Sequence, residues 1–130
     1  MSVQLEVDLD SGVPVYEQVR AQVVAHVAAG RLRPGDRLPT IRALATDLGV
    51  APGTVARAFR ELEATGVVVT RRRAGTQVAA GATAADDAPR AAAAAYADAA
   101  RSAGLTPDEA LDLVRGVLLG TAARRTPPHG

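Results

Sequence analysis

The N-terminal part of the chain has a hydrophobic pattern with the period of an α-helix. Apolar side chains recur every three or four residues between Pro14 and Ala29, which predicts one helix that ends at Gly30. The apolar positions are Tyr16, Val19, Val23 and Val27. Ahead of this helix, residues 1–13 alternate apolar and polar side chains at Val3, Leu5, Val7 and Leu9, which predicts an extended lead-in.

Two shorter helical patterns follow and are separated by a glycine. The first covers Ile41 to Leu48, with Thr40 placed to cap its start and Gly49 to end it. The second begins at Pro52 and stops before Gly66, with apolar positions at Val55, Ala58, Phe59 and Leu62. Two short amphipathic helices joined in this way indicate a helix-turn-helix, although any small helical hairpin has a similar pattern.

A strand-like segment comes directly after Gly66. Residues 67–70 (VVVT) are β-branched, residues 71–75 (RRRAG) predict a basic turn, and residues 76–78 (TQV) return as a second strand. A basic hairpin behind a recognition-type helix is typical of a wing. The sequence therefore predicts a mainly α fold with a small β-wing, a winged helix-turn-helix DNA-binding domain over residues 1–80.

The remaining residues predict a linker and two more helices. Residues 81–88 form a low-complexity linker, and an Ala-rich helix follows from Pro89 to Ala103. A capping box then opens the last helix, with residues at N-cap, N1 and N3: Thr106, Pro107 and Glu109. The apolar stripe of that helix comprises Leu111, Val114 and Leu118. We expect a short C-terminal two-helix dimerisation tail at residues 89–123 and a flexible tail at residues 124–130.

The distribution of charge says more than its total. The formal net charge of the 130 residues is only +1. Residues 31–76, however, contain nine arginines and four acidic residues, whereas residues 81–130 contain five arginines and six acidic residues. A chain with one Phe, two Tyr and no Trp has few side chains to stack on single-stranded bases, so double-stranded DNA is the expected partner.

Composition also excludes several classes of site. The chain has no cysteine, its two histidines (His26 and His129) are isolated, and no paired carboxylates are expected in a cleft. We therefore expect no enzyme, no metal site and no cofactor. The N-terminus lacks the pattern of a signal peptide and no stretch approaches the length of a membrane span, which predicts a soluble cytoplasmic protein without a membrane partner.

The motifs together resemble the N-terminal domain of GntR-family regulators over about residues 10–80. The matching segments are PVYEQV at 14–19, GRLRPGDRLPTIR at 30–42, LGVAPGTVARAF at 48–59, Leu62-Glu63, Gly66 and Gly75-Thr76. Only the short region from residue 89 follows the linker, whereas metabolite-sensing members need a further domain, on the order of 100–200 residues. The chain is therefore similar to the YtrA-like subfamily, in which two short helices serve for dimerisation.

The resemblance implies a sequence-specific DNA-binding regulator, with repression as the family's usual action and a neighbouring transporter operon as its target. The expected DNA-binding residues are Arg42, Gly53, Thr54, Arg57, Arg60, Arg72, Arg73 and Gly75. Arg57 is expected at a guanine and Arg60 at a phosphate. Arg42 is expected to contact the DNA, as an Arg at this position commonly does in the family, and the wing arginines are expected in the minor groove. Alternatives stay open: Arg57 as a solvated residue, Arg60 neutralised by Glu61 and Glu63, and an Arg42–Asp47 ion pair.

One departure from the resemblance concerns the start of the second short helix. YtrA-like members often have Asn on both sides of its first proline, where this chain has Ala51 and Gly53. The helix thereby loses a side-chain cap, worth about 1 kcal/mol. Its free N–H groups are then available to a DNA phosphate, and specificity is expected to depend on Arg57, Thr54 and DNA shape.

The tail predicts a homodimer. A pair of short Ala- and Leu-faced helices leaves one apolar face uncovered, and two copies related by a two-fold axis would cover it and match a palindromic operator. The expected dimerisation residues are Tyr96, Leu111, Val114 and Leu118. The main alternative is a winged helix that acts as a protein-interaction module without specific DNA binding, and no small-molecule effector is identified.

Overall fold

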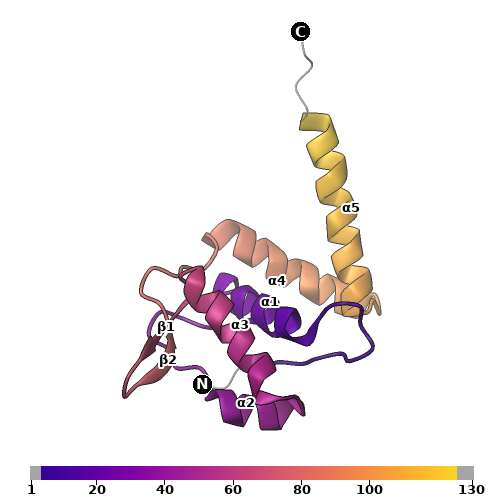
Figure 1. Cartoon of the computed structure of the whole chain (residues 1–130). Coiled ribbons are helices and arrows are strands. Elements are labelled where there is room, and N and C mark those ends of the chain that lie inside the picture. The colour runs from indigo at the N-terminus through magenta and orange to yellow at the C-terminus, as the bar shows by residue number, and fades with distance from the viewer. Residues whose placement is uncertain (1–3, 126–130) are drawn as a thin grey trace. The chain divides into compact units, whose positions relative to one another are not determined.

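The computed structural model describes residues 4–125, and the side chains of residues 4–120. The chain divides into two compact units, one up to Asp86 and one from Asp87 onward. The first contains three helices and a hairpin in the order α1 (Val15–Ala28), α2 (Ile41–Leu48), α3 (Pro52–Ala64), β1 (Val68–Arg71) and β2 (Gly75–Val78) (Figure 1). The second contains α4 (Asp87–Ser102) and α5 (Pro107–Arg125). This confirms the predicted mainly α fold with a small β-wing.

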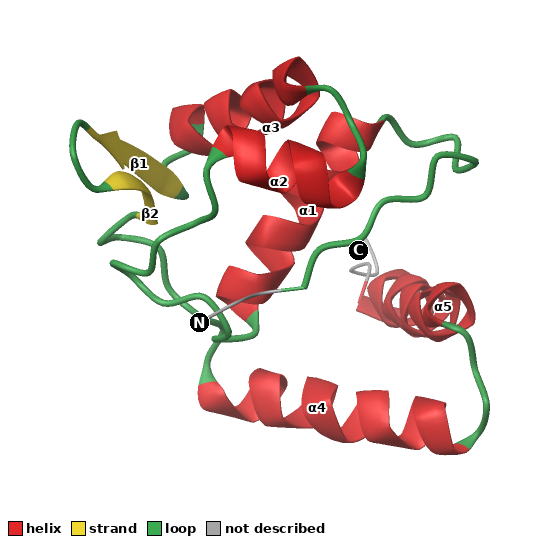
Figure 2. Ribbon diagram, turned by 90° about the horizontal axis from the view of Figure 1, so that it is seen from below, coloured by secondary structure: helices red, strands yellow, loops and turns green. Residues whose placement is uncertain are grey.

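The core of the first unit lies among the three helices and the hairpin. Helix α3 packs against both α1 and α2, and β1 contacts α3 (Figure 2). Most side chains predicted from the helical period are buried, whereas Tyr16, Ile41 and Leu48 are half-buried and pack against the core. The largest fully buried side chains are Val19 and Val23 of α1, Val55 and Leu62 of α3, and Val78 of β2.

Local capping fixes the helix-turn-helix. The Thr40 side chain accepts a hydrogen bond from the backbone N–H of Ala43 at 3.0 Å, which satisfies one of the free donors at the start of α2. Gly49 ends α2 with a φ of 71°, a left-handed conformation that costs glycine little. Pro52 occupies the first turn of α3, where its missing N–H removes no helical hydrogen bond. These boundaries confirm the predicted ones.

The hairpin is antiparallel and its strands are shifted slightly from the prediction. Val68 pairs with Val78 and Arg71 with Gly75, so the turn consists of residues 72–74. The chain before α2 is bonded to β2, since Leu38 N donates to Thr76 O at 2.8 Å and Val78 N donates to Asp36 O at 2.8 Å. The hairpin is thereby anchored to the segment that leads into the helix-turn-helix.

A row of polar side chains on α1 holds the extended N-terminal lead-in. Gln18 and Gln22 exchange hydrogen bonds with the backbone of Asp8 and Glu6, and the His26 ring contacts Gln4 O at 3.0 Å. The helical side chains are four residues apart, a rise of about 6 Å, and their partners in the lead-in are two extended residues apart, about 6.6 Å. The two spacings match, so each side chain meets the lead-in in turn. Leu5 and Val7 pack on the core as the alternation predicts, whereas Leu9 is 70% exposed because the chain turns at residues 8–11; Val3 lies outside the described residues.

The second unit is a helical hairpin, closed by a tyrosine. The Tyr96 hydroxyl of α4 donates to the backbone oxygen of Ala110 in α5 at 2.6 Å. Thr106 and Glu109 make the reciprocal bonds of the predicted capping box, Thr106 N to Glu109 Oε1 at 2.8 Å and Glu109 N to Thr106 Oγ1 at 3.1 Å. None of the described helices is both long and apolar enough to cross a membrane.

Both ends of this unit differ from the prediction. Helix α4 begins at Asp87 and not at Pro89, so two residues expected in the linker are helical. Pro89 is tolerated within the first turn, because the N–H groups there make no intrahelical hydrogen bond. Asp87 pairs with Arg90, and the negative charge of Asp87 suits the positive N-terminal end of the helix. Helix α5 continues to Arg125, so residues 124–125 of the expected flexible tail are helical. Residues 126–130 lie outside the described residues.

Candidate nucleic-acid interface

Helix α3 divides into a buried face and an exposed face. Its buried positions are Val55, Ala58, Phe59 and Leu62. Gly53, Arg57 and Arg60 are exposed and Thr54 is half-buried, so the predicted reading residues lie away from the core stripe. The structure thus leaves this face of α3 free to contact a partner.

The start of α3 has no side-chain cap. Ala51 occupies the N-cap position with φ −68° and ψ 141°, and no side chain bonds the first-turn donors. Thr54 N donates to the backbone oxygen of Ala51 at 3.0 Å. A Cβ built on Gly53 meets nothing within 4 Å, so the surface around the helix start is open. This bears out the expected loss of the cap.

Arg57 is held by two neighbouring side chains. Its guanidinium carbon lies 3.7 Å from the centroid of the Tyr16 ring on α1, and its Nε lies 3.5 Å from Oε2 of Glu61. The Arg57 side chain nevertheless remains 55% exposed. The sequence leaves Glu61 open as a partner of Arg60. The structure pairs Glu61 with Arg57 instead, because residues four apart share a helix face whereas adjacent residues diverge.

A second ion pair lies on α1 beside this group. The Arg20 guanidinium donates to the Glu17 carboxylate and lowers the pKa of that carboxyl. The hydrogen bond from Arg20 to Glu17, and the charges of Glu17 and Glu61, raise the pKa of Arg20. Tyr16 is therefore flanked by charged side chains of both α1 and α3.

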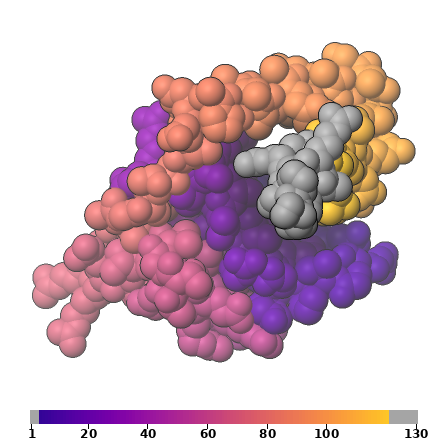
Figure 3. All heavy atoms as spheres, turned by 90° about the horizontal axis from the view of Figure 1, so that it is seen from above, coloured from indigo at the N-terminus to yellow at the C-terminus, as the bar shows by residue number. Residues whose placement is uncertain are grey.

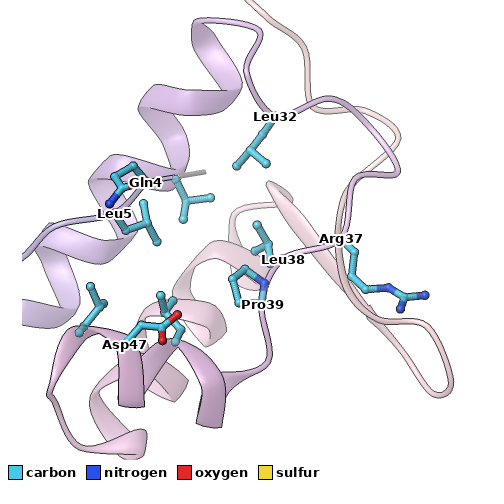
Figure 4. A pocket seen from close by; sticks show the side chains of 10 residues that line it. Gln4, Leu5, Leu32, Arg37, Leu38, Pro39 and Asp47 are labelled. Carbon is cyan, nitrogen blue, oxygen red and sulfur yellow. The ribbon is translucent and has the colours of Figure 1, made fainter. Parts of the chain in front are cut away.

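Arg42 lies in the first turn of α2 and is exposed. Among the described residues it makes no ion pair with Asp47, so that alternative is not formed. Asp47 instead borders a cavity of about 580 Å³ between the lead-in, α1 and α2. Leu5, Leu32 and Leu38 point into this cavity, whereas Arg37 extends away from it (Figure 4).

The wing presents its arginines at the tip. Arg72 and Arg73 belong to the turn and are exposed, and the hairpin projects from the body of the first unit (Figure 3). Gly75 has a φ of 75°, a conformation that side-chain-bearing residues rarely adopt. Arg37, which forms an isolated bridge with Gln77, adds another exposed guanidinium beside β2. No motif in the sequence marks Arg37 as a DNA-binding candidate.

The basic character of residues 31–76 remains at the surface. All nine arginines of this segment are exposed. Within the described part of the chain, only Arg57 among them forms an ion pair with a carboxylate. The other eight guanidinium groups keep their charge uncompensated by an acidic partner, which favours an anionic ligand such as the DNA backbone.

The predicted dimerisation residues are only partly exposed. Leu111 and Leu118 of α5 are 59% and 63% exposed, while Val114 and Tyr96 are half-buried. Leu113, Val117 and Leu119 are also more than half exposed, so apolar side chains cover more of α5 than the predicted stripe. Tyr96 contributes to the contact between α4 and α5 within one chain.

Comparison with known proteins agrees with this geometry. The family model of bacterial regulatory proteins of the gntR family matches residues 15–78. The HTH-type transcriptional regulator Rv1152 of Mycobacterium tuberculosis is 50% identical over 107 residues, which cover 82% of this chain and 88% of that protein. The HTH-type transcriptional repressor YtrA of Bacillus subtilis is 39% identical over 74 residues, 57% of each chain.

Solved structures give the same assignment. The GntR-family transcription factor YtrA from Sulfolobus acidocaldarius has a TM-score of 0.54 at 30% identity, over 91% of this chain and 97% of its own. The DNA-binding domain of AraR, solved in complex with operator ORX1, has a TM-score of 0.53 at 26% identity and covers 60% of this chain and all of its own. The relatives are transcriptional regulators and not enzymes. This chain belongs to the GntR family and is a YtrA-like regulator with a DNA-binding winged helix-turn-helix.

Proposed function

We propose that the chain is a homodimeric repressor that binds a palindromic operator through α3 and the wing. The observation that carries the proposal is the exposed face of α3, which lies between Arg42 on one side and the arginines of the hairpin on the other. Thr54, Arg57 and Arg60 follow this face, with Arg42 at the start of α2 and the hairpin arginines beyond. A helix that enters the major groove reads bases with its N-terminal residues and contacts the backbone with later ones.

Each exposed group has a proposed partner on the DNA. Arg57 donates to the O6 and N7 acceptors of a guanine, and Thr54 contacts a neighbouring base edge. Arg60 and Arg42 contact phosphates on either side. The wing arginines, Arg72 and Arg73, enter the minor groove, and Gly75 allows the hairpin backbone to approach the DNA closely.

The uncovered apolar side chains of α5 support the homodimer. Leu111, Leu118 and Leu119 are exposed to water. A second copy that packs on them would bury this apolar surface, and each Å² removed from water would stabilise the dimer by about 25 cal/mol. A two-fold dimer would place two copies of α3 about one turn of DNA apart, roughly 34–36 Å. Residues 89–123 are the proposed dimerisation region, residues 1–80 the DNA-binding domain and residues 81–88 the connection.

Repression and the target are supported by likeness alone. The Bacillus subtilis relative is named a repressor. We infer a neighbouring transporter operon from the resemblance to YtrA-like regulators. A dimer bound over a promoter would block RNA polymerase. Chromatin immunoprecipitation from the native host tests this target: enrichment at a transporter promoter supports it, and enrichment only elsewhere refutes it.

Selection of bound duplexes from a random pool tests the DNA-binding proposal. We expect a palindromic consensus with two half-sites, bound by two chains per duplex. If Arg42, Arg60, Arg72 and Arg73 of both protomers contact DNA, about eight cations predict roughly a 10⁴-fold loss of affinity between 50 and 200 mM salt. A non-palindromic consensus, a single bound chain, or affinity independent of salt would refute the proposal.

A further inference from the structure

The environment of Arg57 differs from that of the other arginines near α3. A ring from α1 lies 3.7 Å from its guanidinium carbon, and a carboxylate one turn along α3 lies 3.5 Å from its Nε. Arg60 and Arg42, which are also exposed, have no such carboxylate partner within the described residues. Arg57 is therefore restrained without being buried.

The two restraining groups are both half-buried side chains of the folded domain. Tyr16 is half-buried and its ring packs against the hydrophobic core, so the stacking surface belongs to the folded domain. Glu61 is half-buried on α3 and lies close enough to Arg20 for its charge to act on that residue. The group thus joins α1, which has no residue among the expected DNA contacts, to the exposed face of α3.

The geometry leaves the recognition end of the side chain available. The ring covers a face of the guanidinium, and the carboxylate lies nearest to Nε. The terminal Nη groups remain for the paired acceptors of a guanine, which require a planar fork in one orientation. A side chain held in this way has less freedom to lose on binding than a freely moving arginine.

We propose that Tyr16 and Glu61 are positioning residues that orient Arg57 toward a base of the operator, so that part of the sequence specificity is determined from α1. The inference rests on the proposed role of Arg57 as a base-reading residue. Tyr16 and Glu61 themselves make no base contact. Their effect is on the discrimination between the operator and unrelated DNA, and it requires the Arg57 side chain.

The test compares binding to the selected operator with binding to a scrambled duplex of the same length. Tyr16→Leu removes the ring, and Tyr16→Phe keeps it as the matched control. A cation–π contact at an exposed site corresponds to about a two- to fivefold change in affinity. We expect Tyr16→Leu to lose this factor on the operator only and Tyr16→Phe to bind like the wild type. In an Arg57→Ala background, Tyr16→Leu should have no further effect.

Glu61→Gln separates positioning from simple charge. Removing a negative charge near DNA should tighten binding to both duplexes by the same factor if Glu61 only neutralises Arg57. If Glu61 orients Arg57, the ratio of operator to scrambled affinity falls. Equal gains on both duplexes would overturn the proposal for Glu61.

Two further readouts keep the test independent of folding and of the operator. In the free protein, the Tyr16 ring current should shift the Arg57 side-chain protons upfield in the wild type and in Tyr16→Phe, and not in Tyr16→Leu. Far-UV circular dichroism checks that each variant is folded at the assay temperature. Equal losses on both duplexes, or a Tyr16→Leu effect that persists without Arg57, overturn the inference while operator binding by the wild type stands. Failure of the wild type to bind any duplex would overturn both proposals.

Discussion

A serine at position 51 should stabilise the protein, because it supplies the cap that α3 lacks. Ala51 already has the extended N-cap conformation, and no side chain bonds the first-turn donors. A Ser hydroxyl there can accept from the N–H of Gly53 or Thr54, as Thr40 accepts from Ala43 N in α2. We expect Ala51→Ser to raise the free energy of unfolding by about 1 kcal/mol.

The first unit ends at Asp86, so a change of this size shifts its thermal midpoint by about 4–8 °C. Thermal unfolding followed by circular dichroism measures the shift, at one protein concentration because assembly adds to apparent stability. Thr40→Ala is the matched control: it removes an existing cap and should lower the midpoint by a similar amount. An unchanged or lower midpoint for Ala51→Ser, with the expected loss in Thr40→Ala, would refute the reasoning about the uncapped start of α3.

Four other predictions concern binding, assembly and pH. Arg57→Ala should weaken operator binding by about 1–3 kcal/mol in fluorescence anisotropy and leave a scrambled duplex nearly unaffected; equal losses would make it a phosphate contact. Arg73→Ala should reduce the slope of log affinity against log salt by about 1 per protomer, and an unchanged slope would remove the wing arginine from the DNA. Leu118→Glu should give monomers in sedimentation equilibrium, whereas the same change at the similarly exposed Leu9 should not; a dimeric Leu118→Glu contradicts the proposed interface. Because its arginine partner lowers the pKa of Glu17, this pair stabilises the fold above the ordinary glutamate pKa and the contribution is lost as pH falls through the lowered value. Glu17→Gln should therefore reduce the loss of stability on acidification in urea titrations, and an identical acid profile would contradict this.

Local signals made most of the first unit predictable. The caps and helix stops at Thr40, Gly49 and Pro52 act within one turn of the residues that they fix, so the sequence itself contains the cause. The apolar period likewise identified the buried side of α3. The sequence predicts the start of α4 two residues late, at Pro89 instead of Asp87. A proline suits any position of the first turn, so Pro89 alone does not identify the first helical residue.

Contacts between distant segments were not predictable in the same way. Gln18, Gln22 and His26 show a four-residue spacing, but nothing local indicates that the lead-in returns along α1 to meet them. The stacking of Arg57 on Tyr16 joins residues of two helices and depends on how α1 and α3 pack. The Arg57–Glu61 pair did have a sequence signal, its i,i+4 spacing, which outweighs the adjacency of Glu61 to Arg60.

The open surface around Ala51 and Gly53 also bears on how such a regulator changes its target. A Cβ at position 53 would meet no heavy atom within 4 Å beyond the adjacent helix backbone, and Gly53 has no left-handed φ that would strain a replacement. New polar side chains can therefore be introduced at the start of α3 without repacking the domain. If α3 reads the operator as proposed, substitutions at these two positions after a gene duplication would give one copy a different operator while the fold is inherited unchanged.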